Sequence, residues 1–295
     1  NTDLLFTFKK DYGKFNVGAN AGGSIRYNQY VMTDFRAEGL KVVGDYSLNN
    51  AIALITKVPK PNDQQMNSVY GLVSANYDNL IFLDVTARND WSSTLNKDNR
   101  SFFYPSVSSS FILSDIFKLS SSNFNYWKLR ASWAQVGLGG SPYQIDKYYT
   151  PSDFVGSVLT PSTYVTPNIR PQENTNIEAG MDLSALKNRL SYNFTLYQNT
   201  TVDEILGVST PVESGYTTRI INAGEIRNRG IEMSLNAIPV KSKNFSWNVS
   251  ANWSMNRNKV ISLPEEYTGD NYYTISTVAG VLYYNAVVGG SLGDL

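Results

Sequence analysis

The chain has 295 residues, 25 basic and 25 acidic side chains, and neither cysteine nor histidine. A formal net charge of zero, with the charges dispersed along the chain, gives no reason to expect a nucleic-acid partner. The missing cysteine and histidine exclude disulfides, thiolate nucleophiles, His-based triads and metal sites built from these residues. We therefore expect no enzyme, and assign no catalytic, cofactor-binding or metal-ligating residue.

About ten short segments alternate apolar and polar residues with a period of two. In chain order they lie near residues 4–8, 15–21, 66–76, 80–89, 102–113, 127–133, 177–183, 190–196, 231–235 and 245–255. Consecutive side chains of a strand point to opposite faces, so each segment separates an apolar surface from a polar one. The sequence therefore predicts about ten amphipathic β-strands.

The last of these segments shows the pattern most clearly. Phe245, Trp247, Trp253 and Met255 share one face, and serine and asparagine alternate with them on the other. A tilted strand of this length covers on the order of 25 Å, the height of the apolar band of an outer membrane. The two tryptophans, near both ends of the apolar face, fit aromatic girdles at the membrane interfaces. No apolar run is long enough for a membrane-spanning helix, which leaves a closed barrel as the spanning structure.

The connections between the predicted strands alternate between short and long. Tight turns are expected at 11–13, 77–79 and 184–188, whereas 24–65, 90–101, 137–172 and about 25 residues before Ile231 read as polar loops. Outer-membrane barrels combine tight periplasmic turns with long extracellular loops. A soluble β-sandwich would share the alternation, but structureless loops of this length are unusual in one. We predict an all-β fold, a transmembrane antiparallel β-barrel.

Three stretches resemble the SusC/RagA-type TonB-dependent transporters of the Bacteroidetes outer membrane. They are Phe-Tyr-Pro-Ser-Val-Ser-Ser-Ser-Phe at 103–111 with Ser-Asp-Ile-Phe at 114–117, Trp-Lys-Leu-Arg-Ala-Ser-Trp-Ala-Gln-Val-Gly at 127–137, and Ser-Gly-Tyr at 214–216 continuing to Asn-Ala-Gly-Glu-Ile-Arg-Asn-Arg-Gly-Ile-Glu-Met at 222–233. The segment 173–182, Glu-Asn-Thr-Asn-Ile-Glu-Ala-Gly-Met-Asp, stands where the family has a similar one. The resemblance covers about residues 80 to 260.

This resemblance implies an importer of the bacterial outer membrane whose barrel has about 22 strands and is filled by a plug. The chain would supply about ten of these strands, so residues 1–295 are expected to be part of the β-barrel domain, with the plug and the last barrel strands outside it. The implied activity is TonB-dependent import of oligomeric nutrients. The implied partners are a SusD-like surface lipoprotein, TonB in the periplasm, outer-membrane lipid, and an oligosaccharide or peptide substrate; no cofactor is implied.

Charged residues on the polar face of the predicted strands are candidates for the lumen of the barrel. They are Asp84, Arg88, Lys128, Arg130, Glu178, Asp182 and Glu232. They could contact the plug or a passing solute, or they could pair with each other and hydrate the barrel wall, because charges on a strand face need water or partners. We favour the second interpretation.

Aromatic residues of the predicted extracellular loops are candidates for ligand contacts. They are Trp91, Tyr143, Tyr148, Tyr149 and Tyr164, with Tyr104 beside them. Flat aromatic faces can stack on the apolar faces of sugar rings. Extracellular loops of barrels are rich in tyrosine in any case, so a role in the loop structure alone remains the alternative.

Two other classes of protein remain open on the sequence. A passive porin-like channel would need the same alternation without a plug. A soluble carbohydrate-binding β protein or glycosidase would need its outward apolar face to be buried.

Overall fold

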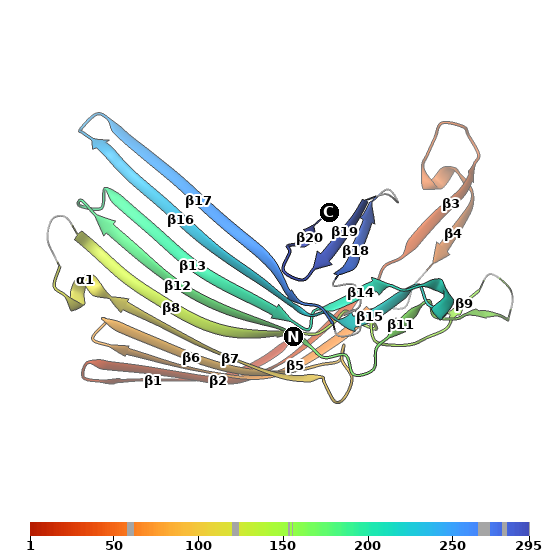
Figure 1. Cartoon of the computed structure of the whole chain (residues 1–295), viewed down its shortest axis with the longest axis horizontal. Coiled ribbons are helices and arrows are strands. Elements are labelled where there is room, and N and C mark those ends of the chain that lie inside the picture. Colours follow the sequence, from red (N-terminus) through yellow and green to blue (C-terminus); the bar gives the residue numbers. More distant parts are fainter. Residues whose placement is uncertain are drawn as a thin grey trace.

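The fold is described by a computed structural model that covers residues 1–57, 62–119, 124–152, 154, 156–264, 272–278 and 282–294. Ten long strands form a single antiparallel sheet in the order β1-β2-β5-β6-β7-β8-β12-β13-β16-β17. Their bounds are β1 Thr2–Tyr12, β2 Phe15–Tyr30, β5 Asn62–Tyr77, β6 Ile81–Ser92, β7 Ser101–Ile112, β8 Phe124–Leu138, β12 Gln172–Ala185, β13 Leu190–Val202, β16 Glu225–Lys241 and β17 Ser246–Ser262. The sheet is strongly curved, like part of a barrel wall (Figure 1).

The two ends of this sheet differ in their connections. Short turns at 13–14, 78–80, 186–189 and 242–245 join strands at one end, on the left of Figure 1. Asp78 and Asn79 have φ angles of 51° and 57°, a left-handed backbone that Asp and Asn tolerate better than most residues. At the opposite end, the connections 31–61, 139–171 and 203–224 are long, and 93–100 is intermediate.

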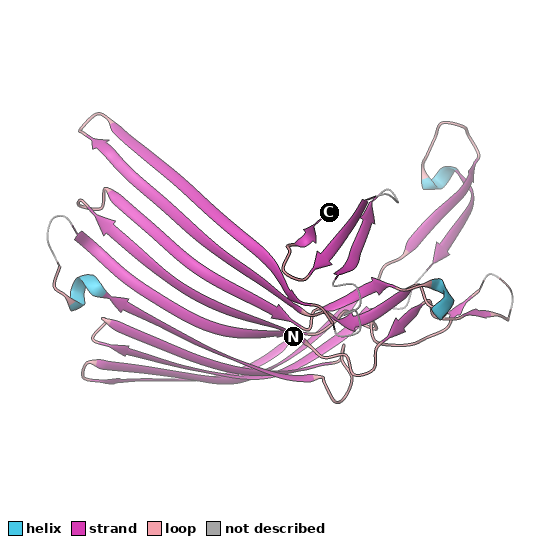
Figure 2. Cartoon of the chain, in the orientation of Figure 1, coloured by secondary structure: helices cyan, strands magenta, loops and turns pink. Residues whose placement is uncertain are grey.

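The long connections carry small secondary-structure elements. These are β3 Asp34–Leu40, η1 Leu48–Asn50, β4 Ala51–Lys57, β9 Thr150–Pro151, β10 Val158–Leu159, β11 Thr163–Val165, β14 Ile205–Ser209, η2 Val212–Ser214 and β15 Thr218–Asn222. After β17 follow β18 Tyr272–Val278, β19 Leu282–Val287 and β20 Leu292–Asp294, and α1 Leu113–Ile116 lies between β7 and β8. Figure 2 shows how strongly strands dominate. None of the helices in the described residues has both the length and the apolar character needed to cross a membrane.

The register of the ten strands gives the sheet one polar and one apolar face. Asp84 is the cross-strand partner of Ser74 and of Ser108, whereas its neighbour Leu83 pairs with Ala75 and Ser109. Many large apolar residues of the apolar face are exposed, whereas several residues of the polar face, such as Ser68 and Asp90, are buried. Curvature crowds the side chains of a concave face, so the polar face lies inside the curve and the apolar face outside.

The strands are longer than the sequence predicts. β2 continues to Tyr30 and β5 begins at Asn62, inside the stretch 24–65 that we expected to be a loop. The same stretch contains the β3–β4 hairpin, and the predicted loop before Ile231 contains β14 and β15. The added ends of β2 and β5 are held by backbone hydrogen bonds between paired strands rather than by burial of one face, so they leave no period-two signal in the sequence.

Candidate functional site: the polar face and the loop cluster

One polar network lies on the concave face across β8, β12 and β13. The Arg130 guanidinium donates from Nη1 to both carboxylate oxygens of Asp182, at 2.9 and 3.0 Å, and from Nη2 to the Thr195 hydroxyl. The Asn193 amide donates to the same carboxylate. Thr195 is 9% exposed, so water has little access to this part of the network. A bidentate, charge-assisted pair of this kind fixes the orientation of both side chains.

Gly180 makes room for this network. It is the direct cross-strand partner of Arg130, and a Cβ at this position would come within 2.6 Å of Arg130 Nε. Because glycine has no side chain, the guanidinium can lie flat over the β12 backbone and reach Asp182 diagonally. The conformation of Arg130 therefore depends on a residue that carries no polar side chain.

A second network lies on the same face across β5, β6 and β7. Arg88 donates from Nε to Asp90 at 2.8 Å and from Nη2 to Ser68 at 2.8 Å, and its guanidinium lies 5.5 Å from the centre of the Tyr70 ring. The Tyr104 hydroxyl donates to the other oxygen of Asp90. Asp90 is only 3% exposed. Its negative charge is thus neutralised by Arg88 and satisfied by two donors, as a buried carboxylate requires.

All seven charged candidates occupy the polar face, as the alternation predicts. Four of them lie outside the two networks: Asp84, Lys128, Glu178 and Glu232. Glu178 accepts a hydrogen bond of 2.6 Å from the Asn176 amide, and Lys128 is the direct cross-strand partner of Asp182. Strand parity also places Asp90, Asn193 and Thr195 on the polar face, although none of them is among the seven candidates. Asp90 was missed because β6 was expected to end at 89, one residue before it.

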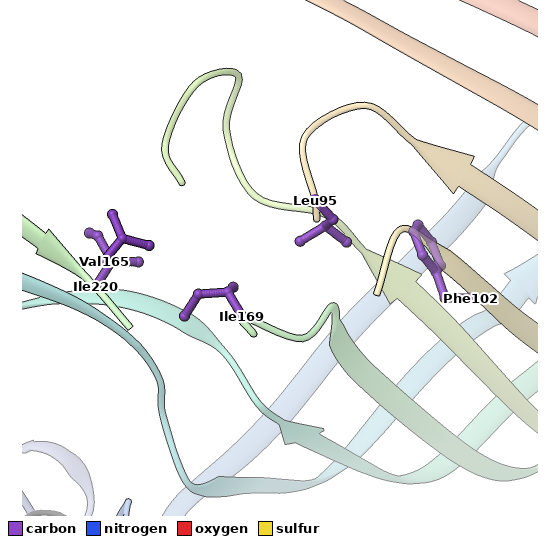
Figure 3. Close-up of a cluster of buried hydrophobic side chains, with 5 residues drawn as sticks. All are labelled: Leu95, Phe102, Val165, Ile169 and Ile220. Atoms are coloured by element: carbon purple, nitrogen blue, oxygen red, sulfur yellow. The ribbon is translucent and has the colours of Figure 1, made fainter. Parts of the chain in front are cut away.

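Three loops at the other end of the sheet meet in a buried apolar cluster, the loop cluster. It consists of Leu95, Phe102, Val165, Ile169 and Ile220, shown in Figure 3. Leu95 lies in the β6–β7 connection and Phe102 early in β7, and the other three residues come from the long connections that follow β8 and β13. Val165 and Ile220 are partners in the parallel pairing of β11 with β15. The loops are therefore packed on each other, as binding loops on a rigid scaffold are.

Polar contacts hold the loop cluster together. Arg170 donates to both carboxylate oxygens of Asp203, at 2.6 and 2.9 Å, which raises the pKa of Arg170 above its ordinary value. The Asn222 amide donates to the carbonyls of Arg170 and Asp203 at 2.9 and 2.8 Å and accepts from the Arg170 backbone N–H at 2.9 Å. Asn99 donates to the carbonyls of residues 168 and 169, both at 3.0 Å. These contacts join segments far apart in the sequence, so strand periodicity could not reveal them.

The tyrosine candidates of the 139–171 connection fall into two groups. Tyr148 and Tyr149 are exposed to 59% and 65%. Tyr164 instead packs edge-on against Tyr216, with ring centres 5.3 Å apart, and lies beneath the cations of Lys147 and Arg219. Tyr148 and Tyr149 therefore offer more of their rings to a ligand than Tyr164 does.

Tyr143 lines a small hollow of about 280 Å³ at the loop end of the sheet. The hollow is also lined by Tyr27, Asp63 and Asp146, and by the hydroxyl-bearing pair Ser93 and Thr94. Tyr27 and Asp63 belong to β2 and β5, in a stretch that we expected to be loop. The hollow brings aromatic rings and carboxylates together, the groups that recognise sugar hydroxyls or cationic groups of a peptide.

Trp91 lies elsewhere than expected. It is in β6, not in a loop, and its parity places it on the apolar face with Val85 and Ala87. Its side chain is 37% exposed. A tryptophan at the end of a membrane-facing row is typical of an aromatic girdle.

Residues 1–293 match the family described as TonB dependent receptor-like, beta-barrel. The chain belongs to this family. Its ten-stranded sheet is thus part of a TonB-dependent receptor barrel, a protein of the bacterial outer membrane, and the predicted fold class is confirmed.

Named relatives agree with this assignment. The protein called TonB-dependent receptor P3 of Formosa agariphila is 28% identical over 283 residues, which are 92% of this chain and 28% of that protein. TonB-dependent receptor SusC of Bacteroides thetaiotaomicron is 26% identical over 217 residues, covering 70% of this chain and 22% of SusC. The resemblance to SusC found in the sequence is thereby confirmed. The chain spans less than a third of the length of these curated relatives.

Solved structures show the same fold. The RagAB peptide transporter superposes with a TM-score of 0.80 at 22% identity, over 97% of this chain and 32% of that one. The siderophore receptor PirA of Pseudomonas aeruginosa gives a TM-score of 0.52 at 13% identity, over 86% of this chain and 42% of that one. At these identities the likeness concerns the architecture alone.

Proposed function

We propose that the chain forms wall and extracellular loops of a receptor that imports oligomeric nutrients across the outer membrane, driven by TonB. The observation that carries the proposal is the match of residues 1–293 to the barrel of TonB-dependent receptors, together with the curved, polar-inside sheet. Such a wall encloses a lumen wide enough to hold a plug. The chain itself would be the fixed part of the importer.

The proposed partners follow from the two ends of the sheet. At the loop end, a SusD-like surface lipoprotein would close over the loops and trap the ligand. At the short-turn end, TonB would act from the periplasm and rearrange the plug. The packed loop cluster supports the place of the lipoprotein at the loop end, because contacts among three loops hold the surface in one shape for a partner to bind.

The proposed substrate is an oligosaccharide or a peptide. Tyr148 and Tyr149 offer exposed rings for stacking, and Asp146, which lines the hollow beside Tyr143 in the same connection, offers an acceptor. The same groups suit sugar hydroxyls and peptide amines, so the loops favour an oligomer with many hydrogen-bonding groups over an apolar solute.

Uptake by whole cells tests the proposal. Cells that carry the full-length receptor are given fluorescent oligosaccharide and peptide pools, with TonB present or deleted. We expect uptake of one pool, and loss of that uptake without TonB. Uptake that continues unchanged without TonB would instead favour a passive porin-like channel.

The charged networks of the polar face are proposed to support the wall and to face the plug. Replacing Arg130 by Glu would place it beside Asp182 and break the network, and the swap Arg130→Glu with Asp182→Arg would restore opposite charges. Uptake and plug retention should fall in the single variant and recover in the swap. If neither responds in the single variant, a functional role of this network is wrong.

A further inference from the structure

Four cations lie close together on the outer, apolar face of the sheet. Arg227 and Arg229 are on β16, and Arg257 and Lys259 are on β17, all near the ends of these strands that adjoin the long loops. The register places Arg227 opposite Lys259 and Arg229 opposite Arg257. By parity these cations share the face of Ile231 rather than the polar face.

Two successive cross-strand pairs of like charge are unfavourable unless something compensates them. Arg227 forms an ion pair of 2.6 Å with Glu225, and Arg229 donates a hydrogen bond of 2.7 Å to the Gln198 side chain. Arg229, Arg257 and Lys259 form no ion pair with any residue in the described part of the chain. The protein thus leaves a local excess of positive charge on a membrane-facing surface.

An apolar groove adjoins these cations. It has a volume of about 420 Å³ and is lined by Arg229 and Arg257 together with Ile177, Leu196, Ile231 and Met255. The two arginines lie one cross-strand row beyond Ile231 and Met255, on the side of the long loops. The groove therefore combines an apolar floor with a cationic end, which suits an amphipathic anion better than a wholly polar or wholly apolar ligand.

We infer that this groove, the β16–β17 basic groove, binds the phosphate group of an anionic outer-leaflet lipid, with an acyl chain along its apolar lining. The long loops mark the extracellular end of the sheet, so the cations lie at the headgroup level of the outer leaflet. Arginine side chains bind phosphate through paired, charge-assisted hydrogen bonds. A bound phosphate between Arg229 and Arg257 would also relieve their mutual repulsion. The site is separate from import and lies on the opposite face from the polar networks.

A lipid-binding assay with the full-length, delipidated receptor in detergent tests the inference. The probe is monophosphoryl lipid A, and its dephosphorylated form is the comparison, with bound lipid counted by native mass spectrometry. The test variant is Arg229→Gln with Arg257→Gln. The matched control is Lys241→Gln with Lys243→Gln, which removes two cations from the other end of the same hairpin, where both are exposed.

We expect the wild type and the control to bind the phosphorylated lipid, and the test variant to bind it roughly tenfold more weakly. The dephosphorylated lipid should bind weakly to all three, and millimolar inorganic phosphate should not displace the lipid. A difference in gel mobility between heated and unheated samples shows that each variant is a folded barrel. Equal binding of both lipids, equal losses in the two variants, or capture of inorganic phosphate in place of the lipid would each overturn the inference.

Discussion

Arg130 and Asp182 form a bidentate ion pair along a diagonal of the β8–β12 pair, because the residue directly opposite Arg130 is Gly180. The guanidinium occupies the space that a side chain at 180 would fill. A glycine in the interior of a strand normally weakens it. Here it is the condition for a charge network across three strands, and this relationship leads to the first prediction.

Replacing Gly180 by Val should displace Arg130 and destabilise the barrel by about 1–3 kcal/mol. The new Cβ would overlap the guanidinium, and the Asp182 carboxylate would lose its partner. Thermal unfolding of the full-length receptor in detergent measures the effect. The control is Ala179→Val, one residue away on the exposed apolar face, where a β-branched residue suits a strand. Equal melting temperatures for the two variants would contradict the prediction.

The Arg88–Asp90 pair should behave differently when one or both charges are removed. Arg88→Met leaves the Asp90 carboxylate buried with Tyr104 as its donor, and should cost about 1–3 kcal/mol of unfolding free energy. Arg88→Met combined with Asp90→Asn removes both charges and keeps an acceptor for Tyr104, so most of the loss should be recovered. Both variants can be compared by thermal unfolding. If the double variant is less stable than the single one, the loss of unfolding free energy in Arg88→Met does not come from an unpaired Asp90 charge.

Asn222→Ala should loosen the loop cluster without disturbing the sheet. This amide makes three hydrogen bonds to backbone groups of Arg170 and Asp203, and its loss leaves these groups without their partner, among them the Asp203 carbonyl in a partly buried contact. Hydrogen exchange should become faster for residues 163–170 and 203–222 and stay unchanged for the β13 strand before them. Glu213→Gln, an exposed position in the same connection, is the control. If hydrogen exchange in the loops stays at the wild-type rate in both variants, the contacts of Asn222 do not order the loops.

The strands of the sheet could be predicted from the sequence, whereas the structure of the loops could not, and the reason is physical. Period-two alternation arises wherever one strand face meets lipid and the other meets polar surroundings, and β17 with its two tryptophans is such a strand. The strand ends near Tyr30 and Asn62 lie beyond that boundary, so their pairing leaves no alternation. The loop cluster depends on contacts between segments about 50 residues apart, such as Val165 with Ile220.

The candidate site was likewise predictable in part. The seven charged residues could be assigned to the polar face because parity alone decides the face of a strand residue. Their partners could not be assigned, because the pairing of Arg130 with Asp182 depends on the register between strands and on Gly180. The aromatic candidates were the least predictable: Trp91 lies on the membrane-facing side, and Tyr164 is engaged by Tyr216.

The difference among the aromatic candidates gives the last prediction. Replacing Tyr148 and Tyr149 together by Ala should weaken binding of the oligomer identified in the uptake assay by roughly tenfold, because each exposed ring can contribute about 0.5–1.5 kcal/mol through stacking. Trp91→Ala should leave that affinity unchanged, since its ring faces the membrane side.

Tyr164→Ala separates direct contact from loop order. Its ring is packed on Tyr216 and lies under two cations, so its loss should increase hydrogen exchange around residues 163–165 as well as reduce affinity. The Tyr148 and Tyr149 variant should reduce affinity with little change in hydrogen exchange, because these two rings are more exposed than that of Tyr164. Fluorescence titration of the full-length receptor gives the affinities. If affinity is unaffected in the Tyr148 and Tyr149 variant but falls in Trp91→Ala, the ligand does not lie over the loop end of the polar face.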